Sequence, residues 1–236
     1  MERAERAHGG IIRARRDRRA LALCYTGHEF GECLPVILDE LEGRGVHASF
    51  FLTGDALRAP EFQPQVERLV AGGHYLGPHS DTHLLYCEWE PQRRTRVSRE
   101  TLVADLEANL AAIERYGVPR ASVTYFIPPY EHYNETIVAW CADLGLTVIN
   151  YTPGTLSVAD WTPRDFPRYR STDEIYESIY RKERDDPHGL NGFLLLMHAG
   201  AGPGRPDKSS RRLGELLDYL LERGYALQRV DELLSA

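Results

Sequence analysis

Leu41-Glu-Gly-Arg-Gly45, followed at once by Val46-His-Ala-Ser-Phe-Phe51, sets the expected architecture of this chain. Its first half is typical of a helix end, because glycine takes the left-handed conformation after a helix at little steric cost. Its second half is typical of a short apolar strand. The same junction recurs further along the chain, at Gly73, Gly117, Gly145 and Gly224. Repeated junctions of this kind predict βα units and a parallel sheet.

The strands beside these junctions are short and mostly apolar, which is typical of strands covered on both faces. They include 21–25, 49–52, 147–150 and 193–197. The helices are expected at about 33–44, 61–72, 98–116, 133–144, 173–184 and 208–223, with ends that vary by about 2–4 residues. Two longer stretches, 84–97 and 152–172, break this rhythm and carry Trp89 and Trp161. Long loops in a small domain are often functional.

Length and composition fit one α/β barrel domain, with 236 residues and a formal net charge of -7. An acidic chain is unsuited to non-specific nucleic-acid binding, so no nucleic-acid partner is expected. The four cysteines form no CxxC pair and no zinc-finger spacing. Cys24 and Cys141 lie in apolar segments and are expected in the core.

The first 19 residues are rich in arginine, and we expect them to form a basic segment before a domain that spans 20–236. They contain no apolar core of a signal peptide, and no later run is long enough for a transmembrane helix. The default expectation is a cytoplasmic protein. A piece of a longer exported protein would look the same. The sequence does not predict the oligomeric state.

Two histidines four residues apart, His79 and His83 in His-Ser-Asp-Thr-His, are the first candidates for chemistry. If this segment is helical, both imidazoles lie on one face and can bind a zinc ion or a similar metal. The segment follows the strand near Tyr75-Leu76, where a loop is expected to open a helix. The spacing is common, so two polar loop histidines without a metal are the alternative.

A metal site needs a third ligand, and catalytic zinc keeps one further position open for water. His28 and Glu29 follow the first strand, in Tyr25-Thr-Gly-His-Glu29, and would point into a barrel mouth. They would equally suit an ordinary solvent-facing pair in a loop.

Two prolines end another strand, in Phe126-Ile-Pro-Pro129-Tyr130-Glu131. Prolines fix the backbone and lack N–H donors, which would leave the N–H of Tyr130 free to face a substrate oxygen. Glu131 is a candidate base. The alternative is that the prolines simply end the strand.

His198 ends the apolar strand 193–197 and precedes small residues, which suits a general acid. A core histidine is the alternative. Asp160 and Trp161 could supply a carboxylate and an aromatic wall from the second long loop. Their shared location supports a common site, because each candidate follows a predicted strand and a barrel brings the carboxyl ends of its strands to one face.

In order and spacing, these motifs resemble those of the polysaccharide deacetylase family, also called the NodB-homology or carbohydrate esterase 4 family. The resemblance runs from about residue 20 to the C-terminus and implies a distorted (β/α)7 barrel of the NodB-homology type. Family motifs are met by His79, Ser80 and His83, in part by Pro129 and Tyr130, loosely by Asp160 and Trp161, and by Leu196 and His198.

The first family motif, T-F-D-D, provides a base and a metal ligand, and it is altered here. Without a gap, Thr26 and Gly27 replace the two aspartates, whereas a shift of two residues puts His28 and Glu29 in their place. The third-motif arginine, which pairs with the base aspartate in the family, is Ile127. A buried aspartate or arginine without its charged partner would destabilise the fold, so it is physically consistent that both are missing together.

The resemblance implies a metal-dependent hydrolase that removes acetyl groups from a carbohydrate, at amide or ester bonds. Glu29 (or His28), His79 and His83 would hold a divalent metal, zinc first, with cobalt, nickel or manganese as alternatives. His28 or Glu131 would act as base and His198 as acid, while the Tyr130 N–H would face the oxyanion. The sugar would contact Tyr86, Trp89, Pro129 and Trp161.

Two other functions stay open. A non-catalytic carbohydrate-binding relative would explain the missing aspartates. A hydrolase of non-sugar C–N bonds, such as cyclic amides or formamides, would explain the altered first and third motifs. A dinucleotide-binding protein is disfavoured, because no G-x-G-x-x-G follows the first strand.

Overall fold

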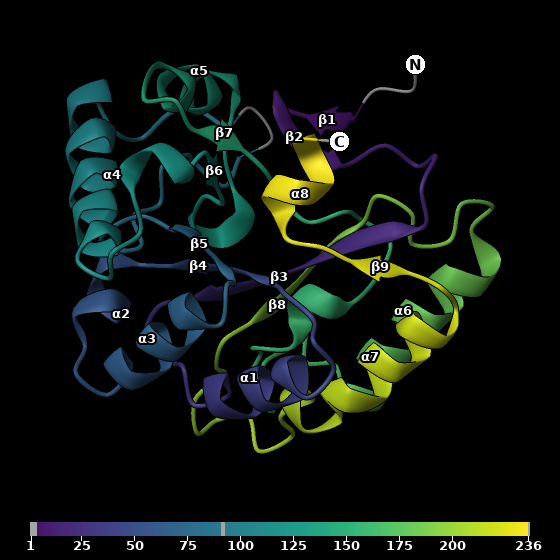
Figure 1. Cartoon of the computed structure of the whole chain (residues 1–236). Helices are drawn as coiled ribbons and strands as arrows, with labels where there is room; N and C mark the ends of the chain where they lie inside the picture. The colour runs from purple at the N-terminus through teal and green to yellow at the C-terminus, as the bar shows by residue number, and fades with distance from the viewer. Residues whose placement is uncertain (1–3, 91–92, 236) are drawn as a thin grey trace.

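Parallel strands and outer helices alternate along the chain, as the glycine junctions predict (Figure 1). The computed structural model describes residues 4–90 and 93–235. The central strands run in the order β5-β4-β3-β8, β9 pairs with the start of β3, and β6 pairs with β7. Their bounds are β3 Ala20–Gly27, β4 Ser49–Leu52, β5 Tyr75–Pro78, β6 Tyr125–Phe126, β7 Thr147–Val148, β8 Leu194–His198 and β9 Ala226–Leu227.

The two sheets are joined into a distorted barrel by contacts at both edges. The hydroxyl of Tyr75, in β5, accepts hydrogen bonds from the N–H groups of Thr124 (3.1 Å) and Tyr125 (2.9 Å), at the start of β6. On the opposite side, strand β2 (Gly10–Arg13) fills the space between β7 and β8 through bridges at Ile149 and Phe193. The expected barrel is therefore present, with an irregular seam.

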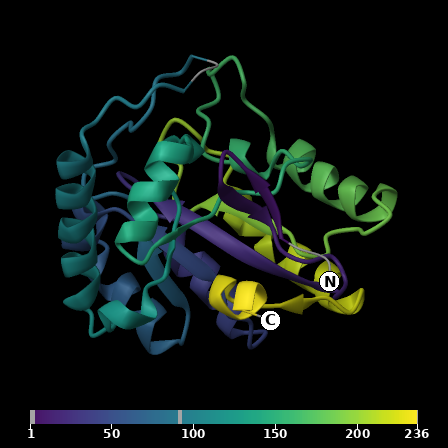
Figure 2. The same ribbon diagram turned by 90° about the horizontal axis from the view of Figure 1, so that it is seen from above.

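The N-terminal segment packs on the barrel, which the sequence did not indicate. Strand β1 (Glu5–Ala7) and β2 form an antiparallel hairpin, and Ile11 and Ile12 of β2 are buried. Figure 2 shows this hairpin lying across the barrel. Of the basic segment expected at 1–19, residues 4–19 thus form part of the folded body, and residues 1–3 lie outside the described residues.

Six helices confirm the expected positions and surround the strands: α1 Leu34–Glu42, α3 Gln63–Ala71, α4 Arg99–Glu114, α5 Glu135–Asp143, α6 Thr172–Asp185 and α7 Leu213–Glu222. The junction glycines all have positive φ, between 63° and 79°. Two short helices, α2 (Gly54–Arg58) and α8 (Val230–Ser235), were not predicted, because five or six residues give too little periodicity.

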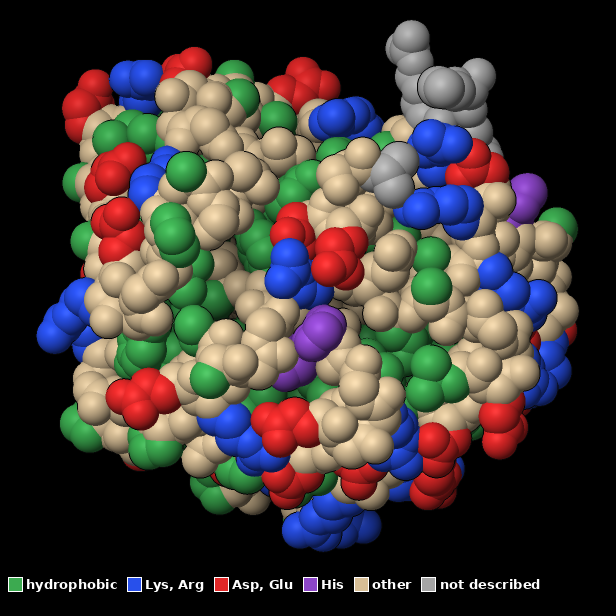
Figure 3. All heavy atoms as spheres, in the orientation of Figure 1, with side chains coloured by type: hydrophobic (Ala, Val, Ile, Leu, Met, Phe, Trp, Pro, Cys, Tyr) green, Lys and Arg blue, Asp and Glu red, His purple; other side chains and the backbone are tan. Residues whose placement is uncertain are grey.

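Apolar side chains fill both the barrel interior and the layer between strands and helices. Ile127, Ile149 and Leu196 belong to the inner cluster. Cys24 and Cys141 are buried, as expected. No described helix has the length and apolar composition needed to cross a membrane. The face shown in Figure 3 carries acidic and basic side chains side by side rather than one broad basic patch.

Candidate active site

A pocket of ≈ 380 Å³ opens where the carboxyl ends of β3, β5 and β8 meet. It is lined by Thr26, Gly27, His28, Glu29, Phe30, His79, His83, Trp89, Tyr130, Glu131, Trp161, Pro163, His198, Gly200 and Ala201. It therefore brings together the predicted site residues except Tyr86, Pro129 and Asp160. A larger hollow of ≈ 660 Å³ lies elsewhere, between α2, α3 and α4, and its lining contains no histidine or cysteine.

His79 is held in an orientation that suits a metal ligand. Its Nδ1 lies 2.7 Å from the carbonyl oxygen of Ile127, so Nδ1–H donates there and Nε2 keeps its lone pair. Its backbone N–H donates to Asn109 Oδ1 at 2.8 Å. Burial, followed by the neighbouring His83, holds the pKa of His79 well below its usual value. The imidazole is therefore neutral near pH 7 and can act as a ligand.

The His79–His83 segment is a loop, so the condition of a helix that would place both rings on one face is not met. The following helix, α4, begins only at Arg99. Ser80 and His83 have φ values of 74° and 60°, and each such left-handed residue costs on the order of 1–3 kcal/mol. The bend nevertheless brings the two rings to a centroid distance of 5.1 Å. The histidines are neighbours through this turn rather than through helical periodicity.

Asp105 of α4 holds the His79–His83 loop through Ser80 and also binds Tyr86. Its Oδ1 accepts from Ser80 Oγ at 3.1 Å, and its Oδ2 accepts from the Tyr86 hydroxyl at 2.6 Å. Tyr86 is fully buried, so the prediction that it contacts a sugar was wrong. Pro129 is also buried and does not line the pocket, which corrects the same prediction for that residue.

We expect Asp105→Ala to destabilise the fold by about 1–3 kcal/mol, because buried donors lose their acceptor. Asp143→Ala is a matched control, since Asp143 pairs with Arg99 at the surface and should cost about 0–1 kcal/mol. Urea unfolding monitored by circular dichroism measures both. Equal free energies of unfolding for the two variants would contradict this role of Asp105.

Strand β3 carries the altered first motif to the pocket. The strand ends at Gly27, and four consecutive residues from Thr26 to Glu29 line the pocket, with Thr26 buried. His28 is half-buried and Glu29 is exposed. The Nδ1 of His28 lies 3.1 Å from Thr53 Oγ1. Both alignments of the first motif therefore place their residues at the pocket, Thr26 and Gly27 without a gap, His28 and Glu29 with the shift.

His83 is the second candidate ligand, and its ring lies close to those of His79 and His28. Burial, followed by His28 and His198, lowers the pKa of His83 to about 4, so this ring is also neutral. His28 stacks on His83 with centroids 4.7 Å apart and an interplanar angle of 7°. Since a metal lies in the plane of each ligating ring, two parallel rings cannot share one ion without a rotation.

Among residues 4–90 and 93–235, no group of three His, Cys, Asp or Glu side chains is placed to hold a metal. The donor chemistry of His79 and His83 still fits a borderline ion such as Zn²⁺. His28 or Glu29 would complete the set by a side-chain rotation.

The turn at Tyr130 and Glu131 has two left-handed residues in succession, with φ values of 59° and 53°. The Glu131 N–H donates to Pro128 O at 3.0 Å, and its carbonyl accepts from Asn150 Nδ2 at 2.9 Å. These bonds fix a conformation that would otherwise be unfavourable. Both side chains line the pocket, and burial raises the pKa of Glu131.

The buried Asp160 pairs with His198, which is half-buried and lines the pocket. Asp160 Oδ1 lies 2.6 Å from His198 Nδ1, while Oδ2 accepts from the His198 N–H at 3.0 Å and from Ser209 Oγ at 3.2 Å. Burial disfavours the imidazolium, but Asp160, helped by Glu131, outweighs it and raises the pKa of His198. The Nε2–H of His198 remains for the substrate, as expected of a general acid.

Two supporting residues escaped the sequence reasoning. The Thr26 hydroxyl is buried in the pocket lining and has no partner among the described residues, so it can bind water or substrate. Glu32 accepts from the N–H groups of Ala201 (3.0 Å) and Gly202 (2.9 Å), which shapes the loop after His198. A contact across about 170 positions leaves no local signal in a single sequence.

Comparison with known proteins settles the family. Residues 14–149, more than half of the chain, match the family model described as polysaccharide deacetylase. This chain belongs to the polysaccharide deacetylase family. The chitooligosaccharide deacetylase of Bradyrhizobium sp. (strain ANU 289) is 28% identical over 211 residues, covering 85% of this chain and 84% of that protein.

Solved structures confirm the fold of this member of the polysaccharide deacetylase family. A carbohydrate esterase 4 family pseudoenzyme from Bacillus anthracis has a TM-score of 0.74 at 22% identity, covering 97% of this chain and 69% of that one. PdaA of Bacillus subtilis, a family 4 carbohydrate esterase, has a TM-score of 0.76 at 16% identity, covering 97% and 86%. Where the family motif has an arginine, Ile127 is buried among the apolar side chains of the inner cluster.

Proposed function

We propose that this chain removes the acetyl group from an N-acetylated carbohydrate, releasing acetate and leaving a free amine. The observation that carries the proposal is one pocket that joins two neutral imidazoles, His79 and His83, to the Asp160–His198 pair. Curated relatives named chitooligosaccharide deacetylase and peptidoglycan-N-acetylglucosamine deacetylase support the class of substrate.

His79 and His83, completed by His28 or Glu29, would hold a divalent metal, with zinc before cobalt, nickel or manganese. When bound, such an ion supplies a Lewis acid that polarises the acyl oxygen and makes water more acidic. His79 and His83 are neutral imidazoles near pH 7, so these two ligands do not have to lose protons before they coordinate.

The protein's own groups carry the protons. Glu131 or His28 removes a proton from the attacking water, whose oxygen bonds to the acetyl carbon. The raised pKa of Glu131 suits this step, because a stronger base accepts the proton more readily. The Tyr130 N–H faces the developing oxyanion. His198 then protonates the amide nitrogen, the C–N bond breaks, and acetate leaves.

The test measures acetate release by zinc-loaded protein from N-acetylglucosamine oligomers and from O-acetylated sugars. Hydrolysis of cyclic amides and formamides is measured in parallel. We expect turnover with the N-acetylated sugars, while turnover confined to the small amides would overturn the carbohydrate assignment.

A binding relative without catalysis is the second candidate, and the stacked His28–His83 pair favours it. In this arrangement His28 faces His83, and neither aspartate of the family's first motif is present in the sequence. Calorimetric binding of N-acetylglucosamine oligomers with no acetate released, with or without zinc, would support this second function.

Exposed aromatic side chains at the pocket rim provide surfaces for sugar rings. Trp89 is 61% exposed and Trp161 is 42% exposed, yet both line the pocket. We expect Trp89→Ala or Trp161→Ala to raise KM about fivefold, since stacking of this kind is worth about 1 kcal/mol. The value of kcat should change less. Leu221→Ala, an exposed apolar residue on α7, is the control and should leave KM unchanged.

A further inference from the structure

The start of the short helix α2 touches both halves of the candidate metal site. Thr53, which precedes the helix, accepts a hydrogen bond from the Ala56 N–H at 3.1 Å. The same hydroxyl oxygen lies 3.1 Å from His28 Nδ1. Thr53 therefore connects the altered first motif to α2.

The next two residues bind the histidine loop through their backbone. The N–H of Gly54 donates to the carbonyl of Ser80 at 3.1 Å, and the N–H of Asp55 donates to the carbonyl of Asp81 at 2.9 Å. The first N–H groups of a helix have no partner inside it, so they are free to make these bonds. They fix two consecutive carbonyl groups between His79 and His83.

Arg58 completes the attachment with its side chain. Nη1 donates to Asp81 Oδ1 at 2.7 Å, and Nη2 donates to Asp81 Oδ2 at 3.0 Å and to Asp55 Oδ1 at 2.8 Å. This two-pronged contact fixes the direction of Asp81, whose side chain is 15% exposed. Gly54 packs so closely that an added Cβ would overlap the Asp81 carboxylate.

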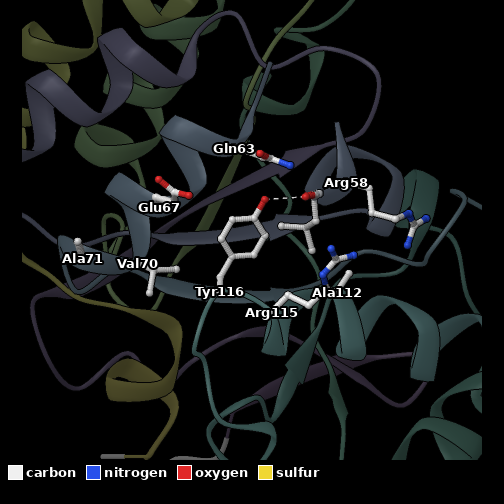
Figure 4. Close-up of a pocket in the computed structure, with 9 residues that line it drawn as sticks. Arg58, Gln63, Glu67, Val70, Ala71, Ala112, Arg115 and Tyr116 are labelled. Carbon is white, nitrogen blue, oxygen red and sulfur yellow. Dashed lines mark hydrogen bonds between the residues drawn. The ribbon is translucent and has the colours of Figure 1, made fainter. Parts of the chain in front are cut away.

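The far end of α2 is anchored independently of the loop. The hydroxyl of Tyr116, just after α4, donates to the carbonyl of Leu57 at 2.6 Å. Figure 4 shows this bond inside the ≈ 660 Å³ hollow, with Arg58 at its edge. Helix α2 is thus bound near its end to Tyr116, in the segment after α4, and near its start to the histidine loop.

We propose that residues 53–58, which we name the α2 brace, position the candidate metal site, with Arg58 and Gly54 as positioning residues. The loop needs such support, because Ser80 and His83 adopt left-handed conformations that persist only when neighbours impose them. The brace sets where His83 stands relative to His79 and His28. The consequence for metal affinity rests on the proposed function.

The test compares Arg58→Met with Arg68→Met in the full chain. Arg68 is a matched control, because it makes a similar fork to Glu42 (2.8 and 2.7 Å) and a bond to Asp39 (2.6 Å), away from the pocket. Its side chain is 33% exposed, against 38% for Arg58. Both variants should therefore lose similar stability in thermal unfolding.

Zinc affinity, measured by competition with a chromogenic chelator, should separate them. We expect Arg58→Met to bind zinc about 10–100-fold more weakly, as for other supports of metal ligands, and Arg68→Met to match the wild type. Arg58→Lys should recover part of the loss, and Gly54→Ala should resemble Arg58→Met. Equal affinities for the Arg58 and Arg68 variants would overturn the proposal.

A second readout needs no metal. In ¹⁵N-labelled protein, the imidazole signals of His79 and His83 should shift in Arg58→Met and stay in place in Arg68→Met. If the wild type binds no zinc, the metal role of the site fails, and these signals alone decide on the brace. Unchanged histidine signals in Arg58→Met would then refute it.

Discussion

Replacing His79 and His83 by alanine together is expected to abolish zinc binding and to lower acetate release about 10³-fold or more. The reason is that a metal contributes several kcal/mol to a charged transition state, and each 1.4 kcal/mol is about tenfold in rate. Both rings are neutral and lie 5.1 Å apart, so they are the preset part of the ligand set. Elemental analysis and an acetate assay on the same preparations measure the two effects.

The control for this variant is His47→Ala with His188→Ala, two exposed histidines outside the pocket. It should keep full zinc content and full activity. A His79/His83 double variant that retains stoichiometric zinc and wild-type turnover would refute the assignment of these ligands.

Asp160→Asn is expected to lower kcat about 10²-fold or more, because it removes the carboxylate that orients and charges His198. The pH profile should change as well. Asp160 raises the pKa of His198, so the protonated acid persists to higher pH in the wild type. Without the carboxylate, the alkaline limb of the kcat profile should move to lower pH.

The same pair predicts how stability depends on pH. A group whose pKa is raised by folding stabilises the protein fully below its unfolded pKa. For His198, this contribution is lost as the pH rises from about 6.5 through the higher folded value. Asp160→Asn should flatten that part of the curve, as measured by thermal unfolding between pH 5 and pH 9. If the alkaline limb of the kcat profile is the same in Asp160→Asn and in the wild type, His198 is not the acid whose pKa Asp160 raises.

The parallel architecture could be predicted because its signals are local. Gly45 and the other junction glycines each end a helix by their own backbone freedom, and the strand that follows is a short apolar run. The gathering of His28, His79, Glu131 and His198 was also predictable, since parallel strands bring their carboxyl ends to one face.

What the sequence could not predict depends on partners distant along the chain. Tyr86 is in a loop with Trp89, yet the carboxylate of Asp105 draws its hydroxyl into the core. The turn at His83 is imposed by neighbours, including the α2 brace, so no periodicity in the histidine segment indicates it. Strand β2 bridges to Ile149 and Phe193, which are far along the chain, so its place in the barrel leaves no local signal.

The central claim is that a first motif reading Thr-Gly-His-Glu still supports metal-dependent deacetylation. Titration of chelator-treated protein with zinc, with acetate release from an N-acetylglucosamine oligomer measured at each step, tests it most directly. The account predicts turnover that rises with added zinc and levels off at about one ion per chain, the number one catalytic site requires. Oligomer binding without acetate release at any zinc level would contradict it.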